Sequence, residues 1–370
     1  MLEAMMPYLT DVFYNAASSH SAGMQAQHAV MKSRIDVANL IGAKMNEIIF
    51  TSGATEAINL AILGASRAAR SQGGSGRTKV VTVMSEHAAV RDCADYCAEH
   101  GFDVAWLPVD AEGCVIMEAA SQIIDDTTIL VSVMAVNNET GVRQDLKTLS
   151  KMAHAHGALF MTDATQAFGK MDINVDELDV DLMTFSGHKI YGPKGVGALF
   201  VRARADRTFA LEPLMFGGGQ ERGIRSGTLN VPGIVGLATA ALLSLAEHDV
   251  ESVRIQSLRD KFEAAMMELP DVRINGLGAD RSYNISNVCF HGIEADLLLL
   301  NLDHVACSKG SACSSAKPKP SPVLTAMGRS EADAHSSLRF SFGRFTTELD
   351  VDRLIHDVSQ AHNHVRYQTC

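Results

Sequence analysis

The chain has 370 residues, of which 46% are hydrophobic and 20% are charged, and its net charge is -11. This is the composition of a soluble globular protein, and the length exceeds that of one ordinary compact core, so we expect two domains. The negative charge excludes a general attraction to phosphate backbones. No local basic patch is evident, so we expect no direct nucleic-acid partner.

The N-terminal residues MLEAMMPYLTDVF include acids and lack the basic region and apolar run of a secretory signal. No apolar run reaches roughly 18 residues, and the most apolar segment, Ile234 to Leu245, is bounded by Glu247 and His248. That pattern favours a buried helix over a membrane span. We therefore expect a cytoplasmic protein with no membrane partner.

Between Glu47 and about Arg202, short apolar runs alternate with longer helical patterns. The runs are EIIF, KVVTVM, ILVSVMAV, ALFMTDA, DLMTF and GALFV. This alternation predicts an α/β fold with a mainly parallel sheet and crossover helices. Ligands of such sheets bind beyond the carboxyl ends of the strands. The polar segments TSGATEA, SEHAAV, NNETG, TDATQA and SGHK follow directly on apolar runs, so we expect the functional site among them.

The pattern changes after about Glu247. A helical stretch, VESVRIQSLRDKFEAAMMEL, leads into two short runs typical of strands, ISNVCFHG and SLRFSFG, with helices between and after them. This predicts a smaller α+β domain. We place the large domain at residues 1–246 and the small C-terminal domain at residues 247–370.

Two residues at predicted strand ends have side chains suited to cofactor chemistry. Lys189 in SGHKIYGPKG follows the run DLMTF, where a lysine partly removed from water can form an imine with an aldehyde. Asp163 in TDATQ could keep a pyridinium nitrogen protonated. Taken singly, Lys189 could be a surface charge and Asp163 a helix N-cap.

A glycine turn and a histidine could bind phosphate and relay protons at the same edge of the sheet. Gly53 to Thr55 form a flexible turn at a predicted helix start, where free N–H groups favour phosphate, although a simple capped turn is the alternative. The run GPKGVG matches no phosphate-loop or dinucleotide spacing and predicts a turn before a strand. His87 could stack on a planar ring and relay protons, or could be only a polar residue at a helix end.

Cys313 lies in CSKGSACSSAKPKPSP, a stretch too rich in Ser, Gly, Lys and Pro for a core, so we expect an exposed thiol on a mobile loop. The seven cysteines are an odd number and indicate reduced thiols without a disulfide framework. We expect the other cysteines considered to be buried: Cys93, Cys97, Cys114 and Cys289. No metal-ligand spacing is present, and His154 and His156 are expected to be solvated near a helix end.

Seven motifs, taken together, resemble the cysteine desulfurases of the NifS and IscS type, in the class V aminotransferase family. They are SGHKIYGPKG, TDATQAFGK, TSGATEAINLAI, VNNETG, GGGQERGIRSGTLN, SKGSACSSA and SLRFSFGRFTTELDVD. The match runs from Asn15 to about Asp352. The resemblance implies a fold-type I homodimer whose large domain, with a mainly parallel seven-stranded sheet, binds pyridoxal 5'-phosphate (PLP). The smaller α+β domain is expected to carry the sulfur-accepting loop.

The resemblance also implies roles for individual residues. Lys189 corresponds to the lysine that binds the cofactor and carries the substrate Cα proton, and His87 to the stacking base. The other implied cofactor-binding residues are Ala54, Thr55, Asn138, Asp163 at the pyridinium nitrogen, Gln166 at the phenolic oxygen, Ser186, His188 and Thr228, the last reaching the neighbouring subunit's phosphate. The implied substrate-binding residues are Asn15, Asn138 and Arg339, the arginine offering a fork suited to a carboxylate.

The implied reaction begins when L-cysteine displaces Lys189 from the cofactor. Lys189 then removes the Cα proton, and the Cys313 thiolate attacks the substrate sulfur. Alanine leaves, and the persulfide remains on Cys313 for delivery to an acceptor protein. The acceptor pathways left open are iron-sulfur assembly, tRNA thiolation and DNA sulfur modification.

Three features depart from the family pattern. The chain opens within a helix, without the strand and Ala-Thr-Thr loop that usually come first; Ala16 replaces a common proline; and the chain stops at Cys370 without a longer tail. The alternatives are a selenocysteine lyase or another fold-type I aminotransferase, or a catalytically weak scaffold that docks sulfur carriers. The exposed Cys313 argues against transamination, which needs no such thiol.

Overall fold

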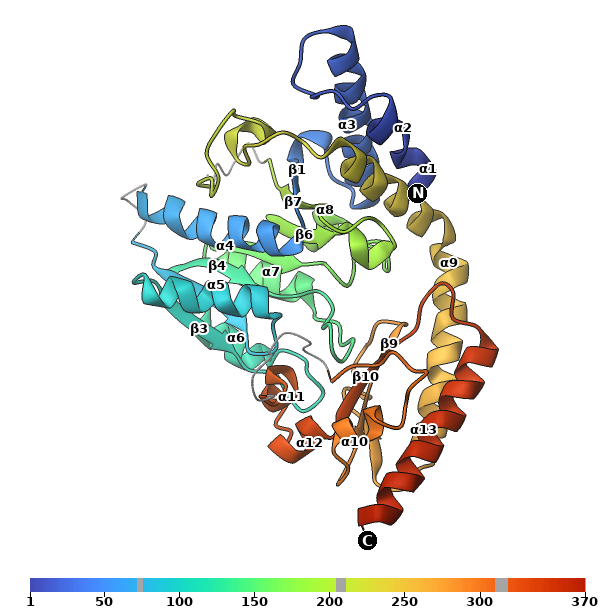
Figure 1. Cartoon of the computed structure of the whole chain (residues 1–370). Coiled ribbons are helices and arrows are strands. Elements are labelled where there is room, and N and C mark those ends of the chain that lie inside the picture. Colours follow the sequence, from blue (N-terminus) through green and yellow to red (C-terminus); the bar gives the residue numbers. More distant parts are fainter. Residues whose placement is uncertain (72–75, 204–210, 310–318, 370) are drawn as a thin grey trace. The chain divides into compact units, whose positions relative to one another are not determined.

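A computed structural model describes residues 1–71, 76–203, 211–309 and 319–369 (Figure 1). The chain forms two compact units. The first contains residues 1–107, 117–135 and 145–248, and the second contains residues 108–116, 136–144 and 249–370. The division at 246 and 247 stays a prediction. The structure adds that two short segments from the first half of the chain belong to the second unit.

The first unit is built on a seven-stranded sheet with the order β1-β7-β6-β5-β4-β2-β3. Its strands are β1 (Ile48–Thr51), β2 (Lys79–Val83), β3 (Asp103–Leu107), β4 (Thr128–Ser132), β5 (Leu159–Asp163), β6 (Leu182–Ser186) and β7 (Gly197–Val201). Only β7 runs antiparallel to its neighbours, β1 and β6, so the other six strands are parallel. The predicted α/β fold with a mainly parallel seven-stranded sheet is confirmed.

The strands at the centre of this sheet are mainly apolar and buried along their length because both faces of the sheet are covered. Every residue of β4 and of β6 is buried, whereas β3, at the sheet edge, begins exposed and is fully buried only at Leu107. Parallel sheets covered on both faces have this continuous apolar pattern. The edge strand β3 lacks it, and for that reason the sequence analysis did not identify it.

Helices connect and cover these strands. The α-helices of the first unit are α1 (Leu2–Met5), α2 (Pro7–Thr10), α3 (Ser21–Leu40), α4 (Ala54–Ser71), α5 (Ala88–Glu99), α6 (Met117–Ile123), α7 (Leu146–Ala155), α8 (Val175–Leu178) and the start of α9 (Val231–Met267). The 3-10 helices are η1 (Met45–Glu47), η2 (Gly187–Ile190) and η3 (Glu221–Gly223). Figure 1 shows α4 and α5 side by side, and they share one apolar cluster with the sheet.

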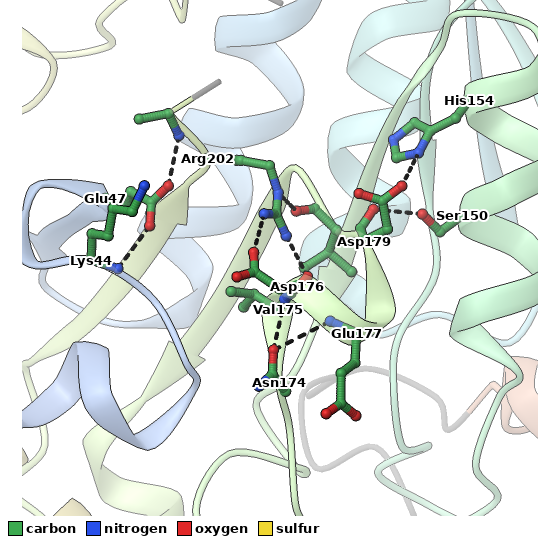
Figure 2. Close-up of polar contacts among 12 residues, drawn as sticks. Lys44, Glu47, Ser150, His154, Asn174, Val175, Asp176, Glu177, Asp179 and Arg202 are labelled. Carbon is green, nitrogen blue, oxygen red and sulfur yellow. Dashed lines mark hydrogen bonds and ion pairs between the residues drawn. The ribbon is translucent and has the colours of Figure 1, made fainter. Parts of the chain in front are cut away.

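Polar side chains next to the amino ends of β5 and β6 are joined by hydrogen bonds and ion pairs (Figure 2). Arg202 donates from Nη1 to Asp176 Oδ1 at 2.5 Å and from Nε to the carbonyl of Val180 at 2.6 Å. The ring nitrogens of His154 lie 2.9 Å from Asp179 Oδ2 and 2.7 Å from Oδ2 of Asp181, which is fully buried. The prediction that His154 is a solvated residue was therefore wrong, because its ring contacts Asp181, a buried acid directly before β6.

The apolar segment Ile234 to Leu245 is helical, but it is part of the 37-residue helix α9 and is not fully buried. Leu242, Leu243 and Leu245 are 45%, 39% and 55% exposed. In the described part of the chain, only α9 has the length and apolar content that could suit a membrane span. Half of that apolar stretch is buried inside the protein.

The second unit has a three-stranded antiparallel sheet with the order β10-β9-β8. Its elements are β8 (Val272–Ile274), β9 (Ile285–Phe290), α10 (Ala295–Leu299), α11 (Pro322–Ala326), α12 (Glu331–His335), β10 (Ser337–Ser341) and α13 (Glu348–Thr369). One core cluster joins the end of α9, the three strands, α10 and α13. The predicted strands at ISNVCFHG and SLRFSFG are confirmed as β9 and β10.

Candidate active site

The predicted site residues of the first unit follow the carboxyl ends of its parallel strands. Gly53 to Thr55 follow β1, His87 follows β2, Asp163 ends β5, and Ser186 to Lys189 end and follow β6. Since parallel strands direct their carboxyl ends to one edge of a sheet, these residues share that edge. Four of the five polar segments named from the sequence thus follow strands of this sheet, whereas NNETG, residues 137–141, belongs to the second unit.

A glycine brings the turn after β1 close to the end of β6. Gly197 on β7 pairs with Thr51 of β1 on one side and with Ser186 of β6 on the other. A Cβ atom at Gly197 would lie 2.7 Å from the Cα of Gly53, so only glycine permits this approach. The turn at Gly53 and the side chain of Ser186 consequently lie at the same level of the sheet.

Helix α4 begins directly in this turn, at Ala54, and runs for 18 residues. Its first N–H groups have no acceptor within the helix, and the positive end of the helix dipole adds to their attraction for an anion. Thr55 lies in this first turn and is exposed. The alternative of a capped turn is also realised, because Ser52 N–H donates to Glu56 Oε2 at 2.8 Å.

After β6 the chain turns sharply through η2, which presents His188 and Lys189. Ser186 Oγ and His188 Nδ1 lie 2.7 Å apart, within hydrogen-bond distance. Desolvation of the ring lowers the pKa of His188, and the positive charges of Lys189, Lys194 and Lys170 lower it further. The neutral imidazole is therefore favoured, and the hydroxyl, the imidazole and the adjacent lysine form a compact polar group.

Asp163 is 5% exposed, and its Oδ1 accepts from the N–H of Thr165 at 2.9 Å and from Thr184 Oγ1 at 3.4 Å. This is a turn after a strand and not a helix N-cap, the alternative raised from the sequence. Gln166 is nearly buried and accepts at Oε1 from Lys170 Nζ at 3.2 Å. A buried carboxylate with neutral hydrogen-bond donors is available here to balance a cationic ring nitrogen.

His87 is the N-cap residue of α5 and is exposed. Its Nδ1 accepts from the N–H of Ala89 at 3.1 Å, so a neutral ring carries its proton on Nε2. The interpretation of His87 as a polar residue at a helix end is thus correct. The hydrogen bond to Ala89 does not exclude ring stacking or proton relay by His87, because Nε2 takes no part in that bond.

A buried acid that the sequence analysis missed lies directly before His87. Glu86 is 1% exposed, and its Oε1 accepts from the N–H of Met134 at 2.6 Å. Within the described residues its Oε2 has no hydrogen-bond partner. Burial raises the pKa of Glu86 well above its usual range, and the negative charge of Asp163 raises it further. Its position in the SEH segment after β2 could have indicated it.

Glu86→Gln is expected to gain stability relative to wild type as the pH rises from about 5 to about 8. Because the pKa of Glu86 is higher in the folded state than in the unfolded state, its protonation stabilises the folded wild type. This stabilisation is complete below the unfolded-state pKa. It is lost as the pH rises, by about 1.4 kcal/mol for each pH unit between the unfolded and folded pKa values. Glutamine binds no proton and lacks this dependence. Urea unfolding of both proteins at both pH values would test this. A difference independent of pH would contradict the raised pKa.

In the second unit, Asn138 and Arg339 are in contact. Arg339 on β10 donates from Nη1 to the carbonyl of Asn138 at 3.0 Å. Its Nε and the Asn138 Oδ1 are buried without a hydrogen-bond partner in the described part of the chain. A cationic donor and an amide oxygen are therefore held together with unsatisfied bonding capacity, as a site for an amino-acid carboxylate and amine requires.

Three predicted residues remain outside these two groups. Asn15 is exposed, and its Oδ1 accepts from the N–H of Ala17 at 2.9 Å in a local turn. Thr228 is exposed on a segment tied to α4, because Arg225 Nε donates to Glu56 Oε1 at 2.7 Å. Cys313 lies outside the described residues.

The cysteines of the described part differ from the expected Cys313 thiol. Cys93, Cys97 and Cys289 are buried as predicted, but Cys114 is only half-buried, because it lies in a surface turn. Burial raises the pKa of Cys93 to about 12 and also raises those of Cys97, Cys114, Cys289 and Cys307. Such thiols are poor nucleophiles.

Among the described residues, no group of three or more acidic, histidine or cysteine side chains could hold a metal ion.

Comparisons with known proteins agree with this geometry. The family model of the class V aminotransferases matches residues 1–354. The cysteine desulfurase IscS of Rickettsia bellii is 45% identical over 368 residues, covering 99% of this chain and 88% of that protein. A solved NifS-like protein is 32% identical with a TM-score of 0.89, covering 99% of this chain and 95% of that one. SspA in complex with cysteine is 34% identical with a TM-score of 0.80, covering 94% and 95%.

The chain therefore belongs to the class V aminotransferase family, and its fold is the fold-type I architecture of the NifS-like proteins. Within that family, the predicted resemblance to the cysteine desulfurases of the NifS and IscS type is confirmed along nearly the whole chain.

Proposed function

We propose that this enzyme is a PLP-dependent cysteine desulfurase, a sulfurtransferase that converts L-cysteine to L-alanine and passes the sulfur to the thiol of Cys313 as a persulfide. The observation that carries the proposal is the shared strand edge of Asp163, Ser186, His188, Lys189 and the N-terminus of α4. It occurs in a chain 45% identical to a cysteine desulfurase. The reaction balances, since cysteine and a thiol become alanine and a persulfide.

The residues present fit PLP. A phosphate is suited by the free amides at Ala54 and Thr55, the hydroxyl of Ser186 and the imidazole of His188. The buried carboxylate of Asp163 suits a protonated ring nitrogen, and Lys189 provides an amine beside them. When bound, PLP supplies an aldehyde that reacts with amines and a protonated ring that withdraws electrons from the substrate Cα.

The roles of the chain's own residues follow. Asp163 would keep the ring nitrogen protonated, Gln166 would hydrogen-bond to the phenolic oxygen, and His87 would stack on the ring. Lys189 would hold the cofactor and would then carry the proton from the substrate Cα. Asn15, Asn138 and Arg339 bind the amino acid, and the guanidinium of Arg339 pairs with its carboxylate.

We also propose a homodimer in which Thr228 reaches the cofactor phosphate of the second subunit. Thr228 is exposed, as this role requires. Helix α3 exposes Met24, Met31 and Ile35 on one stripe, with 55%, 41% and 42% of each residue accessible. Apolar stripes of this kind mark protein interfaces, and a second copy of the chain is the partner that a closed, symmetric assembly provides.

The acceptor is a sulfur-carrying partner protein in the cytoplasm, serving iron-sulfur assembly, tRNA thiolation or DNA sulfur modification such as phosphorothioation. The surface charge of the chain disfavours direct contact with nucleic acid, so the sulfur would pass from protein to protein.

The proposed function is tested by adding L-cysteine and a reductant to the purified holoenzyme and quantifying sulfide and alanine together. Equal amounts of the two products are expected. Cofactor absorbance without alanine production would reject cysteine as the substrate, whereas alanine without sulfide or persulfide would reject the sulfur-transfer step.

A further inference from the structure

The described residues before segment 310–318 are attached to the main chain of Arg339. The N–H of Arg339 donates to the carbonyl of Ser308 at 2.7 Å, and the N–H of Ser308 donates to the carbonyl of Arg339 at 3.2 Å. This is an isolated antiparallel bridge at the residue whose side chain contacts Asn138. One flank of the segment that contains Cys313 is thus fixed to the proposed carboxylate-binding residue.

The described residues after that segment are attached to the neighbour of Asn138. Ser321 is 5% exposed, and its Oγ donates to Oε2 of Glu139, which is 2% exposed, at 2.5 Å. The same Oγ accepts from the N–H of Leu324 at 3.2 Å and so caps α11. One serine hydroxyl therefore fixes both the start of a helix and the second flank to Glu139.

Glu139 is itself held firmly. Its N–H donates to Asn137 Oδ1 at 2.9 Å, and its carbonyl accepts from Asn287 Nδ2 on β9 at 3.2 Å. Burial raises the pKa of Glu139, although the bond from Ser321 and the charge of Arg339 oppose the rise. The charges of Glu139 and Arg339 attract each other, but among the described residues the structure records no ion pair between the two side chains. Neither the sequence analysis nor the proposed reaction uses Glu139.

We propose that Ser321 and Glu139 are positioning residues for sulfur transfer, joined by a hydrogen bond that fixes the chain after segment 310–318 to the amino-acid-binding pair Asn138 and Arg339. The described residues on both sides of the segment are then attached to the residues proposed to bind the substrate or to their chain neighbours. A group on such a segment reaches the substrate more often in a productive geometry than a group on a chain fixed at one end. This inference rests on the proposed function.

Ser321→Ala in the holoenzyme is expected to slow alanine formation in the first turnover about tenfold, because small misplacements of reacting groups reduce rates by one to two orders of magnitude. The KM for L-cysteine and the cofactor absorbance are expected to stay as in wild type. Ser321→Thr keeps the hydroxyl and should restore the rate. Rapid mixing with L-cysteine and quenched alanine analysis measures these rates.

Ser330→Ala is the matched control. Ser330 caps α12 and donates to Asp333 Oδ2 at 2.8 Å, so the change removes the same kind of cap and carboxylate bond elsewhere in the same unit. Its first-turnover rate is expected to equal that of wild type. Glu139→Gln retains an acceptor for Ser321 and should be near wild type, whereas Glu139→Ala should resemble Ser321→Ala. This second pair tests the proposal if Ser321→Ala does not fold.

The proposal is overturned if Ser321→Ala turns over at the wild-type rate, if Ser330→Ala slows the enzyme equally, or if only the KM changes. The proposed function fails independently of these outcomes, because it fails when the wild-type holoenzyme makes no alanine.

Discussion

Cys313→Ala is expected to retain the cofactor absorbance of the wild type and to lose sulfur transfer by three orders of magnitude or more, on the order of the loss caused by removing a catalytic nucleophile. The thiolate is the only group proposed to take the sulfur from the substrate, and the methyl side chain of alanine cannot replace it. Persulfide on the protein can be measured by mass spectrometry, together with the alanine released in one turnover.

Cys307→Ala is the matched control for Cys313→Ala. Cys307 lies six residues earlier and is half-buried, and burial raises its pKa, so its removal should leave sulfur transfer near the wild-type rate. Full activity of Cys313→Ala would show that the sulfur leaves by another route and would remove the persulfide from the proposed function.

Lys189→Ala is expected to lose covalently attached cofactor and to reduce alanine formation by about four orders of magnitude or more. Lys189 is the only lysine of the turn η2, at the end of β6, and it provides both the amine that holds the cofactor and the base for the Cα proton. Absorbance of the PLP-treated protein after gel filtration measures the attachment, and alanine formation with added PLP measures the rate.

Lys194→Ala is the corresponding control, because Lys194 is an exposed lysine five residues further along the same segment. It should keep both the absorbance and the rate. If Lys189→Ala held the cofactor covalently after borohydride reduction, another amine would be the attachment site, and the role assigned to Lys189 would be wrong.

The strand-end site could be predicted because it depends on local order along the chain. Asp163 and Ser186 end buried apolar runs, and the carboxyl ends of parallel strands meet at one edge whatever the details of packing. The predicted placement of Lys189 after the run of β6 and of His87 after the run of β2 is confirmed for the same reason. Their roles with cofactor and substrate remain proposals.

Other features could not be predicted, because they depend on which side chains meet from distant parts of the chain. His154 lies in the last turn of α7, in a polar segment, and only the packing of α7 against β5 and α8 places it against the buried Asp181. Glu86 and Glu139 are ordinary acids by sequence, and their burial and raised pKa values come from the strands and helices around them. Cys114 has a small, weakly polar side chain, but its surface turn leaves it half-buried.

The sequence by itself determined the α/β order of the first unit, the strand-end position of the candidate site and the family of the protein, because these follow from hydrophobic periodicity and from motifs of adjacent residues. Only the tertiary structure decided the antiparallel insertion of β7 between β1 and β6, the assignment of residues 136–144 to the second unit, and the bond between Ser321 and Glu139. These join segments that are far apart in the chain, and their energies depend on burial, which no local pattern reports.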